Sequence, residues 1–213
     1  MTRIVAIDTT SASGGLALLE DGHLIEEVVF DGAGGIEQVV FSELAALMQR
    51  HGWRFEDVHG FAAAAGPGSF TGVRVGLTAA KGMAETVGVQ AAAISNLEAL
   101  ATHGSAPLRA PFFDARRSEV FCAVYDEAGV LIEPERALPL AEWLAGLDPE
   151  AELLAPDPAR FEAGLAGRAV TTTPPTLAAA VGRLAFGRLT DPAGLDANYV
   201  RRSDADLHWR DNG

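Results

Sequence analysis

The stretch Gly66-Pro-Gly-Ser-Phe-Thr-Gly-Val-Arg-Val-Gly76 decides the fold, because it joins a strand-like run at Val58–Ala65 to a helix-like run at Gly72–Val87. A glycine-rich turn in this position can aim backbone N–H groups at an anion, which a helix N-terminus also attracts. No Lys-Ser/Thr pair follows the glycines, so the turn is not a Walker loop. Two interpretations stay open: an anion-binding loop, and a tight turn in which Ser69 or Thr71 caps the helix.

Upstream of this stretch, the chain opens as a β-meander. Three apolar runs, Arg3–Asp8, Gly14–Leu19 and His23–Phe30, have the length and composition of strands. Asp21-Gly22 joins the second run to the third, and this dipeptide suits the positive φ angles of a type I′ hairpin turn. The sequence therefore predicts consecutive strands before the first helix, and not a βαβ unit.

Two predicted helices, Ile36–His51 and Gly72–Val87, carry wide apolar faces. The second has one narrow polar stripe, made by Arg74, Thr78, Lys81 and Glu85. Nearly all its other residues are apolar or glycine, which is too wide an arc for a helix that only covers a sheet. Small residues would allow a close helix–helix approach at Gly72, Gly76, Ala80 and Gly82. We predict a helical partner interface formed by Ile36, Val40, Phe41, Leu44, Leu47, Met48, Val73, Gly76, Leu77, Ala80 and Met83.

The second half of the chain has weaker patterns. The segment His103–Pro111 has the composition of a linker, which predicts two lobes at residues 1–105 and 106–213. Pro174-Pro175 is expected to open a helix that continues to Leu189, since proline is tolerated in a first turn. Between them we expect strands at Phe112–Asp114 and Glu119–Tyr125 and a short helix at Pro139–Ala145, followed by a Pro/Asp-rich stretch at Asp148–Pro158.

Charge and composition exclude several classes of protein. The formal net charge of −13 repels phosphate backbones, so the chain is not expected to bind nucleic acid by itself. No apolar run reaches the roughly 20 residues of a membrane span, and charge interrupts the N-terminus before a signal-peptide core could form. A single cysteine, Cys122, suits a reducing compartment. We expect a cytoplasmic protein with no membrane contact.

Candidate chemical groups are few. The five histidines include no pair spaced for one helical face, and no serine lies in a nucleophile elbow. Asp114, Arg116 and Glu119 have catalytic side chains, but a solvated strand end is the favoured interpretation. The segment Asp8-Thr9-Thr10-Ser11 could hold a metal-bridged phosphate, or Asp8 could cap its own turn. The sequence thus predicts no catalytic residue and no metal site, and a metallopeptidase fails for want of ligands.

Several motifs together resemble the TsaB family, which is related to TsaD and to actin-like (ASKHA, ribonuclease H-like) proteins. The resemblance spans residues 4 to about 210 and is most specific in the block Gly66–Gly76. The other matching motifs are Val5-Ala-Ile-Asp-Thr-Thr10, Ala80-Lys-Gly82, Ser95-Asn-Leu-Glu98, Asp114-Ala-Arg116, Glu119-Val-Phe121 and Tyr199-Val-Arg201.

The resemblance implies a two-lobed α/β actin-like fold with mixed sheets flanked by helices. It also implies a non-catalytic activating subunit of the complex that transfers threonylcarbamoyl to an adenosine next to the tRNA anticodon. TsaD would be the catalytic partner, a TsaE-type ATPase would join the pair, and tRNA would bind only through the complex. Whether the free chain pairs with a second copy of itself as a homodimer stays open, although its wide apolar helix faces would allow it. No cofactor would be required, with room for weak ATP or ADP binding at a vestigial phosphate loop made by Asp8, Thr9, Thr10, Gly66, Gly68, Ser69, Thr71 and Gly72.

Three departures from the family pattern weaken a nucleotide site. Ile36-Glu37-Gln38 stands where the family has His-Thr/Ser-Gln, and Ala64-Ala65 replaces a glycine followed by a polar or basic residue. Asp8-Thr9-Thr10 lacks the glycine that catalytic ASKHA phosphate loops use for close backbone approach. The alternative function is an autonomous ASKHA-type ATP-dependent phosphotransferase or ATPase. That activity needs a second phosphate loop, which the second half of the sequence does not show convincingly.

Overall fold

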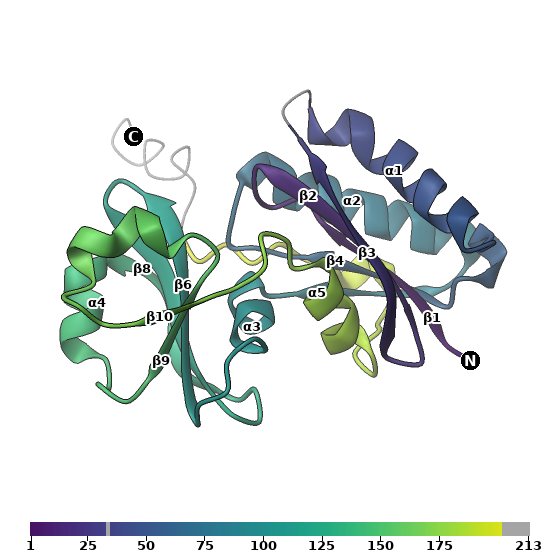
Figure 1. The fold of residues 1–213 in the computed structure, drawn as a ribbon. Helices are drawn as coiled ribbons and strands as arrows, with labels where there is room; N and C mark the ends of the chain where they lie inside the picture. Colours follow the sequence, from purple (N-terminus) through teal and green to yellow (C-terminus); the bar gives the residue numbers. More distant parts are fainter. Residues whose placement is uncertain (33–34, 202–213) are drawn as a thin grey trace, which may run out of the picture.

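The protein has two lobes, each built on a five-stranded mixed sheet (Figure 1). The computed structural model describes residues 1–32 and 35–201. The first sheet has the order β3-β2-β1-β4-β5, with β1 Arg3–Asp8, β2 Ser13–Glu20, β3 His23–Asp31, β4 Gly60–Ala64 and β5 Gln90–Ile94. The second has the order β10-β9-β6-β7-β8, with β6 Leu108–Arg116, β7 Glu119–Asp126, β8 Leu131–Pro139, β9 Glu152–Ala155 and β10 Val170–Thr172. This architecture agrees with the fold class that the family resemblance implies.

The predicted β-meander is confirmed. β1, β2 and β3 pair antiparallel in sequence order, and the parallel strands β4 and β5 extend the sheet beyond β1. Asp21 and Gly22 both have positive φ, at 49° and 80°, as a type I′ turn requires. β1 is buried from Ile4 to Asp8, because helices cover both faces of the sheet.

Helices α1 (Ile36–Arg50) and α2 (Phe70–Val87) lie on the outer face of the first sheet, as Figure 1 shows. Helices α3 (Asn96–Ala101) and α5 (Ala178–Ala185) lie on the other face, toward the second lobe. Helix α2 begins two residues before its predicted start, because the Ser69 hydroxyl caps it by accepting the Gly72 N–H at 3.2 Å. The capped-turn interpretation of Ser69 is thereby confirmed.

Three expectations for the second half were wrong. The expected linker His103–Pro111 ends early, because β6 begins within it at Leu108. The Pro/Asp-rich stretch, where no strand was expected, contains β9, which pairs in parallel with β6. The helix expected from Pro174 to Leu189 runs only from Ala178 to Ala185. It begins late because the residue before a proline is held extended and the Asp8 carboxylate accepts the Leu177 N–H at 2.8 Å, and it ends early because Phe186 is extended. The short helix of the second lobe, α4 at Leu140–Gly146, lies within one residue of its predicted bounds.

The chain crosses between the lobes more than once. The two sheets occupy residues 3–94 and 108–172, on either side of the expected boundary near 105. Helix α5 then returns to the first sheet, where Ala178–Val181 pack against Ile4, Ala6 and Leu19. By packing, α5 belongs to the first lobe and not to a continuous lobe at 106–213. Within the described ranges, none of the helices combines the length and hydropathy that a membrane crossing requires.

Candidate partner-docking groove

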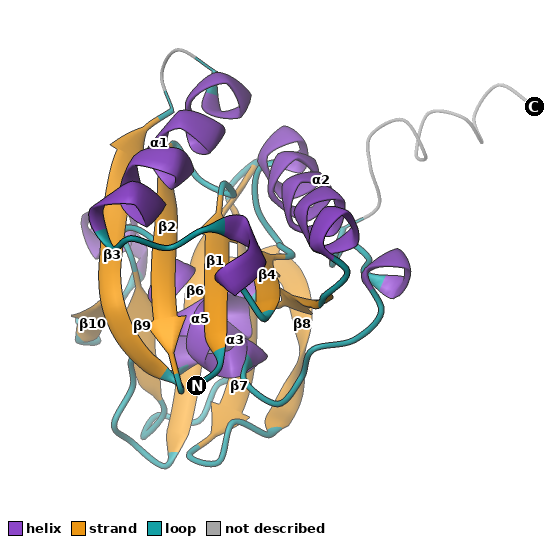
Figure 2. Ribbon diagram, turned by 90° about the vertical axis from the view of Figure 1, so that its right-hand side faces the viewer, coloured by secondary structure: helices purple, strands orange, loops and turns teal. Residues whose placement is uncertain are grey.

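An apolar groove of about 960 Å³ lies along the outer side of α2, between α2 and α1. Figure 2 shows the two helices side by side on one face of the first sheet. The groove is lined by Glu37, Phe41, Phe55, Phe70, Thr71, Arg74, Val75, Thr78, Ala79, Gly82, Met83 and Thr86. Exposed aromatic rings form much of its wall, since Phe41 is 52% exposed and Phe70 is 45% exposed.

The structure buries most of the residues that the sequence predicts for a partner interface. Only Phe41 and Met83 of that set line the groove, and Ile36 is half-buried beside it. The other expected interface residues are buried in the protein's own core, beneath the helices: Val40, Leu44, Leu47, Met48, Val73, Gly76, Leu77 and Ala80. Their side chains pack on the first sheet and are therefore not available to a partner.

The small residues of α2 serve the helix–sheet contact. The Thr9 hydroxyl donates to the Gly72 carbonyl at 2.7 Å, and a Cβ at Gly76 would lie 2.6 Å from the same Thr9 oxygen. Gly72 and Gly76 therefore let α2 lie directly against the end of β1, and not against a partner helix. Gly82 is different, because a Cβ there would meet no heavy atom from the rest of the described chain within 4 Å.

The N-terminal end of the groove is closed by a stack of three side chains. The Arg74 guanidinium lies 3.7 Å from the centroid of the Phe70 ring, and Arg74 Nε donates to the Tyr199 hydroxyl at 3.1 Å. The Phe70 and Tyr199 ring centroids are 5.6 Å apart. Through Tyr199, the C-terminal segment of the described chain therefore contacts the surface of α2.

The same C-terminal segment joins the two lobes. The Asn198 N–H donates to the Ala65 carbonyl at 2.8 Å, while Asn198 Nδ2 donates to Glu135 of β8 at 2.6 Å. Arg201 donates to the Ala115 carbonyl at 3.0 Å and pairs with Glu119. Four consecutive residues, 198–201, therefore connect the groove end of α2 to both sheets.

The buried polar side chains of the expected phosphate loop form hydrogen bonds with one another and with nearby backbone. Asp8 Oδ1 accepts the Thr10 N–H at 2.9 Å and the Thr10 hydroxyl at 2.6 Å, and Asp8 Oδ2 accepts the Leu177 N–H. Asn96 Nδ2 donates to Thr10 Oγ1 at 2.7 Å. Asp8, Thr9, Thr10 and Asn96 are all buried, so this is a satisfied network that ties β1, α3 and the start of α5.

The Gly66 turn pairs with the same network. Gly66 has a φ of 97°, which glycine adopts readily, and its N–H donates to Asn96 Oδ1 at 3.1 Å. Asn96 Nδ2 also donates to the Pro67 carbonyl at 3.0 Å, and the Ser69 N–H donates to the Thr10 carbonyl at 2.9 Å. A Cβ at Gly68 would lie 2.9 Å from that carbonyl, so Gly68 is also in close contact with the loop after β1. These backbone groups of the turn are therefore bonded inward, whereas Phe70 and Thr71 are exposed and line the groove.

The cleft between the lobes is small. Its volume is about 80 Å³, and its walls include Asp8, Thr10, Ser11 and Asn96 together with apolar side chains. Pockets for drug-sized ligands measure roughly 300–1,000 Å³. The cleft is smaller than this range.

The remaining candidate groups have structural partners. Asp114 forms an ion pair with Arg160 at 2.7 Å, and Glu119 pairs with Arg201, so both carboxylates support the β6–β7 hairpin. Arg116 lies in that hairpin with a φ of 62°. Burial raises the pKa of the Cys122 thiol to about 12, which leaves it protonated and unreactive at neutral pH. Among residues 1–32 and 35–201, no three His, Cys, Asp or Glu side chains are grouped as metal ligands.

Known proteins that are similar to this chain belong to the same family that its motifs resemble. The family model of TsaD, the tRNA N6-adenosine threonylcarbamoyltransferase, matches residues 37–187. The chain is 30% identical to the tRNA threonylcarbamoyladenosine biosynthesis protein TsaB of Bacillus subtilis, over 97% of each chain. It is also 30% identical to Escherichia coli TsaB over 135 residues, which are 60% of this chain and 58% of that protein.

Solved structures agree in fold. YeaZ of Pseudomonas aeruginosa superposes with a TM-score of 0.78 and 24% identity, covering 93% of this chain and all of that one. The ethanolamine utilization protein EutJ of Carboxydothermus hydrogenoformans superposes with a TM-score of 0.51 and 10% identity, covering 86% of this chain and 90% of that one. The likeness to EutJ shows only that the two-lobed actin-like fold is shared, whereas the match to Bacillus subtilis TsaB covers nearly every residue of both chains. The chain belongs to the TsaB family.

Proposed function

We propose that this chain is a non-catalytic subunit of a tRNA threonylcarbamoyladenosine-forming complex, and that it holds a TsaD-type catalytic subunit through the α1/α2 groove. The α1/α2 groove is the observation that best supports this proposal. It is wide, apolar and walled by exposed aromatic rings, and monomeric proteins rarely leave such a surface uncovered. In this role the chain contributes a surface, and the reaction takes place on its partner.

The family match supports a TsaD-type chain as the occupant of the groove. The TsaD family model aligns with residues 37–187, which include nearly all of α1 and the whole of α2. A TsaD-type subunit would therefore present its own version of the same helix pair. Two such pairs can pack face to face about an approximate two-fold axis, with the same patch used on both sides. A TsaE-type ATPase and the tRNA would join this heterodimer, with the tRNA held mainly by the other subunits because this chain carries a net charge of −13.

The same geometry supports pairing of the free chain with a second copy of itself. A groove that accepts a homologous helix pair also accepts its own duplicate, in a symmetric contact. The TsaD-type subunit would then compete with the second copy for one surface.

The interior of the chain favours a structural over a catalytic role. Asp8, Thr10 and Asn96 satisfy one another and the backbone, and the cleft beside them measures about 80 Å³. An ATP-dependent phosphotransferase would need these groups free and a larger cleft. We therefore propose that no cofactor is required, and that any ATP or ADP binding by the free chain is weak.

Reconstitution tests this function. The chain alone, supplied with threonylcarbamoyl adenylate and unmodified tRNA, is expected to give no modified nucleoside, because it supplies no acid, base or metal to the transfer. Addition of a TsaD-type and a TsaE-type subunit is expected to give modification that falls to background when this chain is omitted. The modified nucleoside is measured by mass spectrometry of digested tRNA. Modification by this chain alone, or full activity without it, would contradict the proposal.

A further inference from the structure

Phe55 lines the groove without belonging to either groove helix. It lies in the short 3-10 turn Phe55–Asp57, within the connection between α1 and β4. Its side chain is 36% exposed, so one part of the ring faces the groove and the rest is covered. A residue in a connecting loop normally has a mobile side chain, and the contacts of this turn decide whether Phe55 is an exception.

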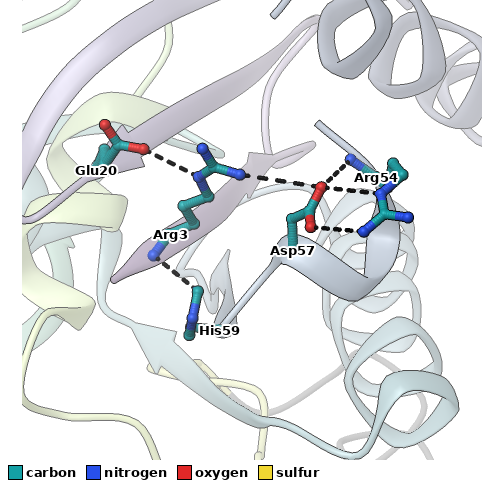
Figure 3. Close-up of polar contacts among 5 residues, drawn as sticks. All are labelled: Arg3, Glu20, Arg54, Asp57 and His59. Carbon is teal, nitrogen blue, oxygen red and sulfur yellow. Dashed lines mark hydrogen bonds and ion pairs between the residues drawn. The ribbon is translucent and has the colours of Figure 1, made fainter. Parts of the chain in front are cut away.

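A polar cluster fixes the turn to the start of β1, as Figure 3 shows. Asp57 Oδ2 accepts the backbone N–H of Arg54 at 3.0 Å, and Asp57 Oδ1 pairs with the Arg54 guanidinium at 3.1 Å. The Arg3 guanidinium lies 3.9 Å from Asp57 and 2.9 Å from Glu20. The Arg3 N–H donates to His59 Nδ1 at 3.2 Å. Asp57 is the one member that bonds both to the backbone of the turn and to β1.

Apolar contacts also hold the same turn against the first sheet. The Phe55 ring stacks on Phe61 of β4, with centroids 6.2 Å apart and an interplanar angle of 28°, and Phe61 is fully buried. Trp53 and Val58, on either side of the turn, are also buried in the core beneath α1 and α2. The backbone on both sides of Phe55 is therefore anchored, and its ring has a fixed support.

Phe55 and Phe70, the aromatic residue at the other end of the groove, differ in whether an arginine covers the ring. The face of Phe70 is covered by the Arg74 guanidinium, which a partner would have to displace or pack around. No cation–π or ring contact other than that with Phe61 is found for Phe55 among the described residues. An aromatic side chain that is already ordered loses little conformational entropy on binding, and rigid aromatic residues are the usual energetic centres of interfaces.

We propose that Phe55 is the specificity-determining anchor of the groove for a TsaD-type subunit, and that Asp57 is the positioning residue that keeps the ring in place. This inference rests on the proposed function of the groove. A TsaD-type partner would present an apolar recess opposite Phe55, and a chain without that recess would be excluded by the fixed ring. Specificity then comes from a side chain that cannot move aside, and not only from apolar area.

Calorimetric titration with a TsaD-type subunit tests the pair. Phe55→Ala is expected to raise the dissociation constant about thirtyfold, as the loss of an interface anchor does. Asp57→Ala is expected to raise it about fivefold, because the ring must then be ordered on binding. The double variant is expected to bind no more weakly than Phe55→Ala alone, since positioning has no value once the ring is gone. Glu20→Gln is the matched control: it removes an ion pair of the same cluster but no bond to the turn, and should bind normally.

Each outcome bears on a different claim. Additive effects of Phe55→Ala and Asp57→Ala would overturn the positioning role of Asp57. If Phe55→Ala binds normally while Phe41→Arg does not bind, the anchor is refuted and the groove stands. If both variants bind normally, the groove itself is refuted as the docking surface. Phe55→Leu keeps an apolar side chain over Phe61 and serves if the alanine variant fails to fold; it should bind about fivefold more weakly, and unchanged binding would refute the anchor.

Discussion

Replacing Gly82 by arginine is expected to leave the chain folded and up to about 1 kcal/mol more stable, while it weakens pairing with a TsaD-type subunit by at least about a hundredfold. Gly82 lies inside α2, where any residue other than proline favours the helix more than glycine does. A Cβ there would meet no heavy atom from the rest of the described chain within 4 Å, and Gly82 lines the groove, so a longer side chain would enter it. In a complex, the guanidinium would be buried against apolar surface without a partner.

Two measurements separate the effects of Gly82→Arg. Urea denaturation gives the free energy of unfolding, and calorimetry gives the dissociation constant of the complex. Ala46→Arg is the matched control, because Ala46 is an exposed residue of α1 that does not line the groove, and this variant should pair normally. A folded Gly82→Arg chain that pairs with undiminished affinity would remove the groove from the account. Gly76→Arg could not serve, since its side chain would collide with Thr9 and unfold the lobe.

Replacing Asn96 by alanine is expected to lower the free energy of unfolding by on the order of 4 kcal/mol. The Asn96 side chain is buried and bonds to three groups: the Gly66 N–H, the Pro67 carbonyl and the Thr10 hydroxyl. Alanine would remove the hydrogen-bond partner of these groups in the buried junction between β1, the turn and α3. The loss is measured by urea denaturation followed by circular dichroism.

Gln90→Ala is the control for that experiment, because Gln90 is a polar but exposed residue of the adjacent β5, and its loss should cost less than about 0.5 kcal/mol. If these residues support only the fold, millimolar ADP is expected to leave the melting temperature of the wild-type chain nearly unchanged. A marginal loss of stability for Asn96→Ala, combined with a clear rise in melting temperature on adding ADP, would show that these residues serve a ligand and not the fold.

The first lobe was largely predictable from the sequence, because its signals are local. Asp21-Gly22 fixes the hairpin, and the apolar period of 36–51 fixes α1 to within one residue. In the second lobe the decisive contacts are distant. β9 is only four residues long and is a strand because it pairs with β6, which begins more than 40 residues earlier. Nothing in the composition of 148–158 indicates that pairing.

Most residues of the predicted interface set are buried in the chain's own core, for a related reason. An apolar stripe shows which face of a helix is buried, but not whether the helix's own sheet or a partner buries it. Here the sheet buries Val40, Leu44, Leu47 and Met48. The available signal was Phe41, a large apolar residue one position away from that stripe. Phe55 gave no periodic signal at all, since it lies in a loop.

The loop after β1 could not be assigned from sequence, because its partners are remote. The Asp8 carboxylate accepts the N–H of Leu177, which is 169 residues away, and Thr10 accepts from Asn96, 86 residues away. A sequence pattern cannot distinguish such an internal network from a phosphate site, since both use carboxylates and hydroxyls. Only the fold shows that these side chains hydrogen-bond to one another and to the Leu177 N–H.

Hydrogen exchange on forming the complex tests the central claim most directly. The exchange of backbone amides is compared, by mass spectrometry, between the free chain and its complex with a TsaD-type subunit. Peptides from α1, α2 and the turn at Phe55–Asp57 are expected to exchange more slowly in the complex, because burial of the groove opposes local opening of these elements. Peptides from α4 and β9 in the second lobe are expected to exchange at unchanged rates. Slower exchange in the second lobe, with unchanged rates over α1 and α2, would contradict the account.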